Sequence, residues 1–551
     1  DHRDLHLSLR RQRQMCIRDS DYVIVGAGSS GSALAGRLAA NSKIKILLIE
    51  AGPKDYNPYI KMPIGYGKLF YDQRVNWKFS TEPEENLNGK RMYWPRGKVL
   101  GGSSSINAMV FARGSKSDFD EWGENANGWH WQDVEPFFRK MESWKGASNQ
   151  GRGYSGPVQV TDVSKQAHPL TNRYLEATEQ IGITQNPDYN TGNIEGSFVY
   201  QTNTHKGLRS SASSAYLSQQ KKHRNLVIIT QAHVKKVLFE GSKAVGVEYS
   251  HKGKINVANA AKEIILSAGA LASPQLLQVS GIGPAKTVKE LNIKVINDLP
   301  DVGLHLKDHI GVDHTLLTNQ PSLNQLLRPL SGKIKVAFQY LLTRSGPLSM
   351  SLNQGGGFVK SDPNLSVPDL QLYFSPLSYT TAPLGKRPLM APDPYPAVRL
   401  GFSLCKPTSE GKLSVQSPDS SIPPKFFGNY LSTEYDQKTM ISGMKLMRKL
   451  AKTEALREII LSEKIPGDDV KSDEDLLDFA RANAETVFHQ CGTCRMGNNP
   501  LNSVVDEKLK VRGVSGLRVA DASIFPTIPS GNINAPSIMV GEKAAEMILD
   551  G

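Results

Sequence analysis

The sequence predicts an α/β protein that combines a Rossmann-type dinucleotide-binding domain with a smaller α+β domain. Near the N-terminus, a glycine-rich turn joins a short apolar run to a helical pattern, and a second apolar run follows. Strand–glycine–helix patterns return after residue 260 and near the C-terminus, while residues 320–462 mix alternating strands with amphipathic helices. We therefore expect one sheet built from distant parts of the chain and a separate α+β lobe.

The stretch 21–52 carries the strongest of these patterns. Residues 22–25 are apolar enough for a strand that is buried on both faces, and residues 32–40 form the following helix. Between them lies the pattern G-x-G-x-x-G, formed by Gly26, Gly28 and Gly31. The second apolar run, residues 44–49, ends in Glu50, where a carboxylate would bind ribose hydroxyls. Together these features predict a dinucleotide site.

The remaining elements follow from apolar alternation and helical periodicity. A helix-and-loop region at 122–146 precedes a strand at 157–161 and a helix at 171–182. Strands at 226–231, 234–239, 244–249 and 263–266 lead to a helix at 271–279. The α+β lobe is expected to contain helices at 333–343 and 432–451 and strands at 369–373, 398–404 and 411–416. A strand at 517–520 and a helix at 537–549 close the chain.

Composition limits the partners and the location. The net charge is +13, but there is no long basic run and no pattern of stacking aromatics, so we expect no nucleic-acid binding. No apolar stretch reaches the length of a membrane span, although peripheral contact with an anionic membrane stays open. The four cysteines are too few for a disulfide framework and favour a reducing, cytoplasmic location. Cys491 and Cys494 have no second pair, so no metal site is expected.

Five ordered motifs resemble those of the glucose–methanol–choline (GMC) oxidoreductases, especially the choline dehydrogenase-like and primary-alcohol enzymes. They are residues 97–107, 269–283, 299–309, 489–497 and 521–542. The resemblance implies a Rossmann-type FAD-binding domain made of residues 21–160, 224–315 and 490–551. It implies a substrate-binding domain and cap made of residues 161–223 and 316–489. Residues 1–20 are basic, lie outside the resemblance and are predicted to be a disordered or artefactual leader.

The resemblance also implies which residues hold FAD. Gly26, Gly28, Ser29 and Ser30 correspond to the pyrophosphate site, Glu50 to the ribose site and Val234 to the adenine site. The whole predicted set is Gly26, Gly28, Ser29, Ser30, Glu50, Ala51, Arg96, Gly97, Gly101, Ser104, Asn107, Ala108, Met109, Val110, Val234, Ala268, Asp521, Ala522, Asn532, Asn534 and Pro536. Where many relatives carry a histidine that links FAD covalently, this chain has Ile106, so we predict non-covalent FAD.

The predicted chemistry is the oxidation of a primary alcohol to an aldehyde. The hydroxyl proton needs a base with a pKa near the working pH, which is the property of histidine. By resemblance, His489 is this base, Asn532 holds the substrate oxygen, and Phe488 bounds the substrate pocket. The N-terminus of the closing helix is expected to point its partial positive charge at the reactive ring.

Several alternatives stay open at this point. Choline, aliphatic, aryl and furanic alcohols all remain candidate substrates, and the electron acceptor is oxygen, a quinone or another acceptor. A flavin-containing lyase is one alternative. A fatty-acid photodecarboxylase is another, because such enzymes share a segment like Leu404-Cys405-Lys406-Pro407, although His489 departs from their pattern.

Overall fold

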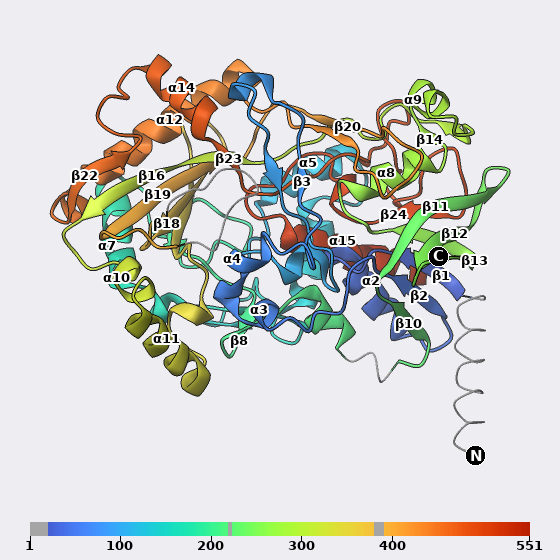
Figure 1. The fold of residues 1–551 in the computed structure, drawn as a ribbon, viewed down its shortest axis with the longest axis horizontal. Coiled ribbons are helices and arrows are strands. Elements are labelled where there is room, and N and C mark those ends of the chain that lie inside the picture. The colour runs from blue at the N-terminus through green and yellow to red at the C-terminus, as the bar shows by residue number, and fades with distance from the viewer. Residues whose placement is uncertain (1–19, 219–222, 380–390, 551) are drawn as a thin grey trace.

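The computed structural model describes residues 20–218, 223–379 and 391–550 of the chain. Figure 1 shows two lobes, each built on its own sheet, with the C-terminal helix near the middle of the molecule. This arrangement confirms the predicted fold class, a Rossmann-type domain with a second α+β domain.

The first sheet has a parallel part whose strands come from distant parts of the chain. Neighbours pair in parallel in the order β10, β2, β1, β13, β24. Their bounds are β1 Ser20–Val25, β2 Ile46–Ile49, β10 Leu226–Ile229, β13 Lys254–Leu266 and β24 Leu517–Val519. All four residues of β2 are buried, as expected for a strand with both faces covered.

The second part of this sheet is antiparallel and was only partly predicted. Strand β12 (Lys243–His251) pairs with the first half of β13, and β11 (Ala232–Glu240) pairs with the other edge of β12. The predicted strand 263–266 is therefore only the end of β13. Its first half contains lysine, asparagine and alanine, which have low strand propensity, and pairing with β12 overrides that preference.

The second sheet is antiparallel and has the order β22, β16, β19, β18, β17, β7, with β23 also paired to β16. Its strands are β7 Gly196–Val199, β16 Ile310–Thr318, β17 Gly355–Val359, β18 Leu370–Ser375, β19 Ala397–Leu404, β22 Ile460–Ile465 and β23 Glu485–Thr486. Helices α7 (Pro169–Gln180) and α12 (Glu434–Ala451) pack on it. Every residue of β18 and β19 is buried.

Two predicted domain boundaries differ from the elements observed. The boundary between residues 315 and 316 falls inside β16, which pairs with β19 from Gly311 to Leu317, so we assign the whole strand to the second lobe. Ser20 was placed in the leader but belongs to β1, because it already pairs with Ala260 of β13. Residues 1–19 lie outside the described residues.

Two helices begin three residues earlier than predicted, and both begin next to the candidate active site. Helix α2 (Ser29–Ala39) starts directly after Gly28, and α15 (Asn534–Leu549) starts before Pro536. Proline is tolerated there because the first helical turn needs no backbone donor from it. The two helices pack closely, since a Cβ on Gly541 would lie 2.3 Å from the backbone oxygen of Ser30.

The other helices surround these layers. They are α3 Pro58–Lys61, α4 Tyr66–Leu69, α5 Lys116–Asn125, α6 Trp131–Met141, α8 Ala272–Val279, α9 Ala285–Glu290, α10 Leu323–Leu327, α11 Leu330–Thr343, α13 Glu454–Arg457 and α14 Asp473–Asn483. Short strand pairs complete the fold: β3 Phe79–Ser80 with β4 Tyr93–Trp94, β5 Glu142–Lys145 with β6 Val158–Thr161, β8 Thr204–His205 with β9 Leu208–Arg209, β14 Ile282–Gly283 with β15 Asn297–Asp298, and β20 Lys412–Ser414 with β21 Lys425–Phe427.

Candidate active site

A cavity of about 1270 Å³ is lined by residues of both lobes. Gly26 and Glu50 of the first lobe and Val312 and Arg399 of the second all contribute to its wall. Pockets for drug-sized ligands are about 300–1,000 Å³, so this one has room for a dinucleotide and a second molecule.

The cavity brings together most of the residues predicted from the sequence. The predicted residues that line it are Gly26, Gly28, Ser29, Ser30, Glu50, Ala51, Arg96, Gly97, Asn107, Ala108, Met109, Val110, Val234, Ala268, Phe488, His489, Asp521, Ala522, Asn532 and Asn534. Gly101, Ser104 and Pro536, which were also predicted, are not among the residues that line the cavity. The Ser104 hydroxyl donates to the Gly101 oxygen at 2.5 Å and accepts from the Ala212 amide at 3.0 Å, so it holds the loop together.

The glycine turn is a cradle that larger residues would fill. Gly26 has φ +98°, and a Cβ on it would lie 2.5 Å from the backbone oxygen of Ser267. A Cβ on Gly102 would lie 2.7 Å from Cα of Gly28. The hydroxyls of Ser29 and Ser30 donate to Asn534 Oδ1 and to the Ser537 backbone oxygen. Helix α2 therefore offers an anion its first backbone N–H groups and not these hydroxyls.

Glu50 lies at the end of β2 and braces this turn. Its Oε2 accepts from the Ala27 amide at 2.9 Å, and its Oε1 accepts from the Gly52 amide at 2.8 Å. Burial raises the pKa of this carboxyl to about 7, against the lowering effect of those two amides. At neutral pH, a carboxyl in this setting can accept a hydrogen bond from a ribose hydroxyl or donate one to it.

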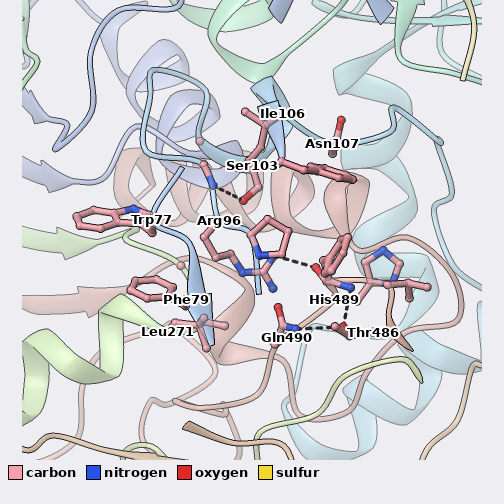
Figure 2. A pocket seen from close by; sticks show the side chains of 18 of the residues that line it. Trp77, Phe79, Arg96, Ser103, Ile106, Asn107, Leu271, Thr486, His489 and Gln490 are labelled. Atoms are coloured by element: carbon pink, nitrogen blue, oxygen red, sulfur yellow. Dashed lines mark hydrogen bonds between the residues drawn. The ribbon is translucent and has the colours of Figure 1, made fainter. Parts of the chain in front are cut away.

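Arg96 supplies a buried cation with an unused donor. Its Nη1 donates to the Phe488 backbone oxygen at 2.8 Å, whereas its Nη2 is buried without a partner among the described residues. Burial lowers the pKa of this guanidinium to about 10. Figure 2 shows Arg96 between the Ser103 loop and His489. A buried donor of this kind fits a carbonyl or anionic oxygen of a bound ring.

Phe488 has a strained backbone directly before the predicted base. Its φ is +69°, which is uncommon for a bulky residue. Its amide donates to Thr486 Oγ1 at 2.8 Å and its oxygen accepts from Arg96, so both sides of the residue are held. The Phe488 ring meets Phe70 edge-on at 5.4 Å between centroids. These rings form an apolar wall beside the base.

The backbone of His489 is fixed by a buried carboxylate. The His489 amide donates to Asp308 Oδ1 at 2.7 Å. The other oxygen, Asp308 Oδ2, accepts from the Tyr430 hydroxyl at 2.5 Å, from Gln490 Nε2 at 2.6 Å and from the Thr486 hydroxyl. Sequence reasoning did not find this role of Asp308, although the residue lies within a motif that the resemblance used.

The side chain of His489 belongs to a hydrogen-bond chain whose first end is a backbone carbonyl. His309 Nε2 lies 3.1 Å from the Cys405 oxygen, and His309 Nδ1 lies 2.9 Å from His489 Nδ1. A carbonyl only accepts, so His309 Nε2 carries the proton. Burial lowers the pKa of His309 to about 4, so this ring is neutral and its Nδ1 accepts. His489 Nδ1 must then be the donor, which leaves the lone pair on His489 Nε2.

The second end of the hydrogen-bond chain independently assigns the lone pair to the same nitrogen of His489. The Tyr200 hydroxyl donates to the Leu372 backbone oxygen at 2.6 Å, so its oxygen accepts from Gln371 Nε2 at 3.0 Å. The same Gln371 amide donates to Asn532 Oδ1 at 3.2 Å. Asn532 Nδ2 therefore faces His489 Nε2, at 3.1 Å, as a donor. Both ends assign the lone pair of His489 to Nε2.

His489 is also neutral at physiological pH. Burial lowers its pKa well below 6.5, and His309 and Arg96 lower it further. The site thus holds an unprotonated imidazole nitrogen beside an amide donor, which is an arrangement for taking a proton from a bound hydroxyl. His309 is the last residue of the motif at 299–309, and its hydrogen bond is to the predicted base. Gln371 carried no motif signal.

Comparison with known proteins identifies the family. Models of the GMC oxidoreductases match residues 20–311 and residues 407–541. The chain belongs to the GMC oxidoreductase family. It is 40% identical to an alcohol dehydrogenase [acceptor] of Pseudomonas putida, covering 96% of this chain and 95% of the relative. It is 39% identical to the mitochondrial choline dehydrogenase of Homo sapiens, covering 96% and 89%.

Solved structures agree with this assignment. A variant of the formate oxidase of Aspergillus oryzae superposes with a TM-score of 0.89 at 27% identity, covering 97% of this chain and 98% of that one. This GMC oxidoreductase is accordingly a flavoenzyme of the group that acts on CH–OH donors, and the predicted cofactor FAD is confirmed. The glycine cradle and the unpaired Arg96 donor fit that cofactor.

The photodecarboxylase alternative finds no support. The two relatives named above are an alcohol dehydrogenase and a choline dehydrogenase, and Cys405 is fully buried outside the cavity lining of this GMC oxidoreductase. Within the described ranges, Cys405, Cys491 and Cys494 are free thiols, and no three metal-binding side chains cluster. Across the same ranges, no helix has the length and apolar character to cross a membrane.

Proposed function

We propose that this GMC oxidoreductase oxidises a primary alcohol to an aldehyde, with His489 as the base and Asn532 as the holder of the substrate oxygen. The observation that carries the proposal is the lone pair on His489 Nε2, which faces the cavity and the Asn532 amide. FAD, when bound, supplies the acceptor of the hydride.

The substrate hydroxyl enters between the two side chains and replaces their direct 3.1 Å contact. Asn532 Nδ2 then donates to the substrate oxygen, while His489 Nε2 takes the hydroxyl proton. Because Gln371 holds Asn532 and His309 holds His489, neither side chain has to reorient during the step. The strained Phe488 and its neighbour Phe70 exclude water from the same corner of the cavity.

The residues that would hold FAD divide by their chemistry. The N–H groups at the start of α2 suit the pyrophosphate, and Glu50 suits a ribose. Arg96 and the N-terminus of α15 suit the polar edge of the ring, because both favour negative charge. Asp521 acts indirectly: its carboxylate accepts from the Gly269 amide at 2.8 Å and so fixes the loop that lines the cavity.

A test is anaerobic bleaching of the bound flavin by a panel of choline, aliphatic, aryl and furanic alcohols. At least one should bleach the wild-type protein, and His489→Ala should slow bleaching by about 10²–10⁴-fold. His251→Ala, at a partly exposed site on β12, is the control and should bleach at the wild-type rate. If His489→Ala bleached as fast as the wild type, His489 would not be the base.

The same experiment separates the remaining alternatives. Re-oxidation of the bleached protein by oxygen or by a quinone dye identifies the electron acceptor. A lyase without net redox chemistry would leave the flavin oxidised with every alcohol and would still convert its own substrate. The cytoplasmic location stays a prediction from cysteine usage.

A further inference from the structure

Helix α11 carries an apolar stripe on its outer face. Leu330, Ile334, Phe338, Leu341 and Leu342 are each between 60% and 73% exposed. At about 3.6 residues per turn, this spacing puts all five side chains on one side of the helix. Single exposed apolar residues are ordinary on a surface, but five on one 14-residue helix form a contiguous patch that indicates a binding surface.

The opposite face holds the helix firmly in place. Gly332, Val336 and Tyr340 are buried, and the Tyr340 hydroxyl donates to the Gly207 backbone oxygen at 2.8 Å. Val336 belongs to a hydrophobic cluster that includes Met109, a residue of the cavity wall. The stripe is thus presented outward by an anchored helix, which Figure 1 shows at the edge of the molecule.

The segment of the chain that contains the stripe carries charged residues of one sign. Between Asp313 and Asp362 the chain has no acidic residue, and its basic residues are Arg328, Lys333, Lys335, Arg344 and Lys360. Lys333 and Lys335 are exposed and leave the helix at the two edges of the stripe. An apolar stripe bordered by lysines is the pattern of a helix that lies in the interface of an anionic membrane. A second copy of this chain fits less well, because it would bring the same cations against each other.

We propose that α11 docks this protein on the surface of an anionic phospholipid membrane. The five apolar side chains enter the boundary between head groups and acyl chains, and Lys333 and Lys335 reach the lipid phosphates. The contact is peripheral. Helix α11 then lies between the lipid and the cluster of Val336 and Met109, which reaches the cavity wall.

The test is flotation of the FAD-loaded protein with two kinds of vesicle, equimolar phosphatidylglycerol–phosphatidylcholine and pure phosphatidylcholine. The wild type should bind the anionic vesicles at least about tenfold more strongly than the neutral ones. Combining Ile334→Gln, Phe338→Gln and Leu341→Gln should lower binding to anionic vesicles by at least about tenfold, and glutamine preserves the helix. Lys333→Glu with Lys335→Glu should do the same through charge alone.

The matched control combines Ile255→Gln and Val257→Gln, which replace side chains of β13 that are 61% and 46% exposed, and it should bind like the wild type. Flavin content and alcohol-dependent bleaching in vesicle-free buffer should be the same for all variants. The proposal is overturned if the wild type does not float with anionic vesicles, or if the α11 variants float as well as the control. It is also overturned if light scattering detects a dimer that the α11 changes dissociate, since the stripe would then bind a second copy.

Discussion

Replacing His309 by leucine tests whether the hydrogen-bond chain sets the tautomer of the base. His309 is fully buried and bonds to His489 Nδ1 at 2.9 Å and to the Cys405 oxygen at 3.1 Å. Leucine fills the space but cannot accept from His489. The imidazole of His489 is then free to move its proton to Nε2, where the proton blocks the lone pair that faces the cavity.

The size of the effect follows from the lost bond. One buried hydrogen bond contributes about 0.5–1.5 kcal/mol, and an unpaired buried donor costs about 1–3 kcal/mol. A difference of about 1.4 kcal/mol is tenfold in rate, so kcat should fall about 10- to 100-fold. KM should change little, because His309 does not line the cavity. His309→Gln should restore the rate to within about threefold, since its amide can accept from His489 and donate to the Cys405 oxygen.

The assay is anaerobic stopped-flow reduction of the flavin, followed as a function of alcohol concentration to separate kcat from KM. The matched control is His314→Leu, which removes a buried histidine from β16, the strand that begins directly after His309; His314 pairs with Glu463 at 3.3 Å. It should lower the thermal stability but leave the rate unchanged. Equal rates for the wild type and His309→Leu, or no recovery with His309→Gln, would refute the tautomer argument.

Three further predictions follow from single residues. The pKa of His489 is lowered well below 6.5, so this histidine stays neutral as the pH falls past that value. The value of kcat/KM should therefore change by less than about 1.5-fold between about pH 7.5 and 6. With an ordinary histidine as the base, kcat/KM would fall about fourfold over the same range. Gly26→Ala should yield protein with little flavin, since its Cβ would lie 2.5 Å from the Ser267 oxygen, whereas Gly89→Ala, with open space and φ +72°, should keep its flavin absorbance. Acid precipitation should release all flavin into the supernatant, because Ile106 offers no nucleophile; flavin in the pellet would contradict this.

The sequence predicted the parts whose signals are local. The strand, glycine turn and helix at residues 20–39 follow from apolar runs and glycine spacing, and the structure has them with shifts of a few residues. The cavity also brings together nearly all the residues that the motifs implied, including His489 and Asn532, which are distant from Gly26 along the chain. Motifs carry this information because side-chain identity is what the cofactor and substrate require.

The parts that could not be predicted depend on partners distant in the chain. The strand β13 was predicted too short because its first half gains its stability from pairing with β12. The left-handed φ of Phe488 has no sequence signal, because it depends on Arg96 holding the carbonyl from far away in the sequence. His309 and Gln371 matter because of which nitrogen each presents, and that property emerges only when the two lobes are folded together.

Cys405 shows how a residue can be essential through its backbone and dispensable through its side chain. Its carbonyl anchors the chain that ends at His489 Nε2, while its thiol is buried among apolar residues, with its pKa raised well above 9.0 by burial. Cys405→Ala keeps the carbonyl, so kcat should stay within about twofold, and the small cavity should cost about 1 kcal/mol of stability. Stopped-flow reduction and thermal unfolding measure the two effects. A large loss of rate without a loss of stability would mean that the thiol takes part in the chemistry, as a cysteine-dependent mechanism would require. The structure argues against that role, because Cys405 is not among the residues that line the cavity.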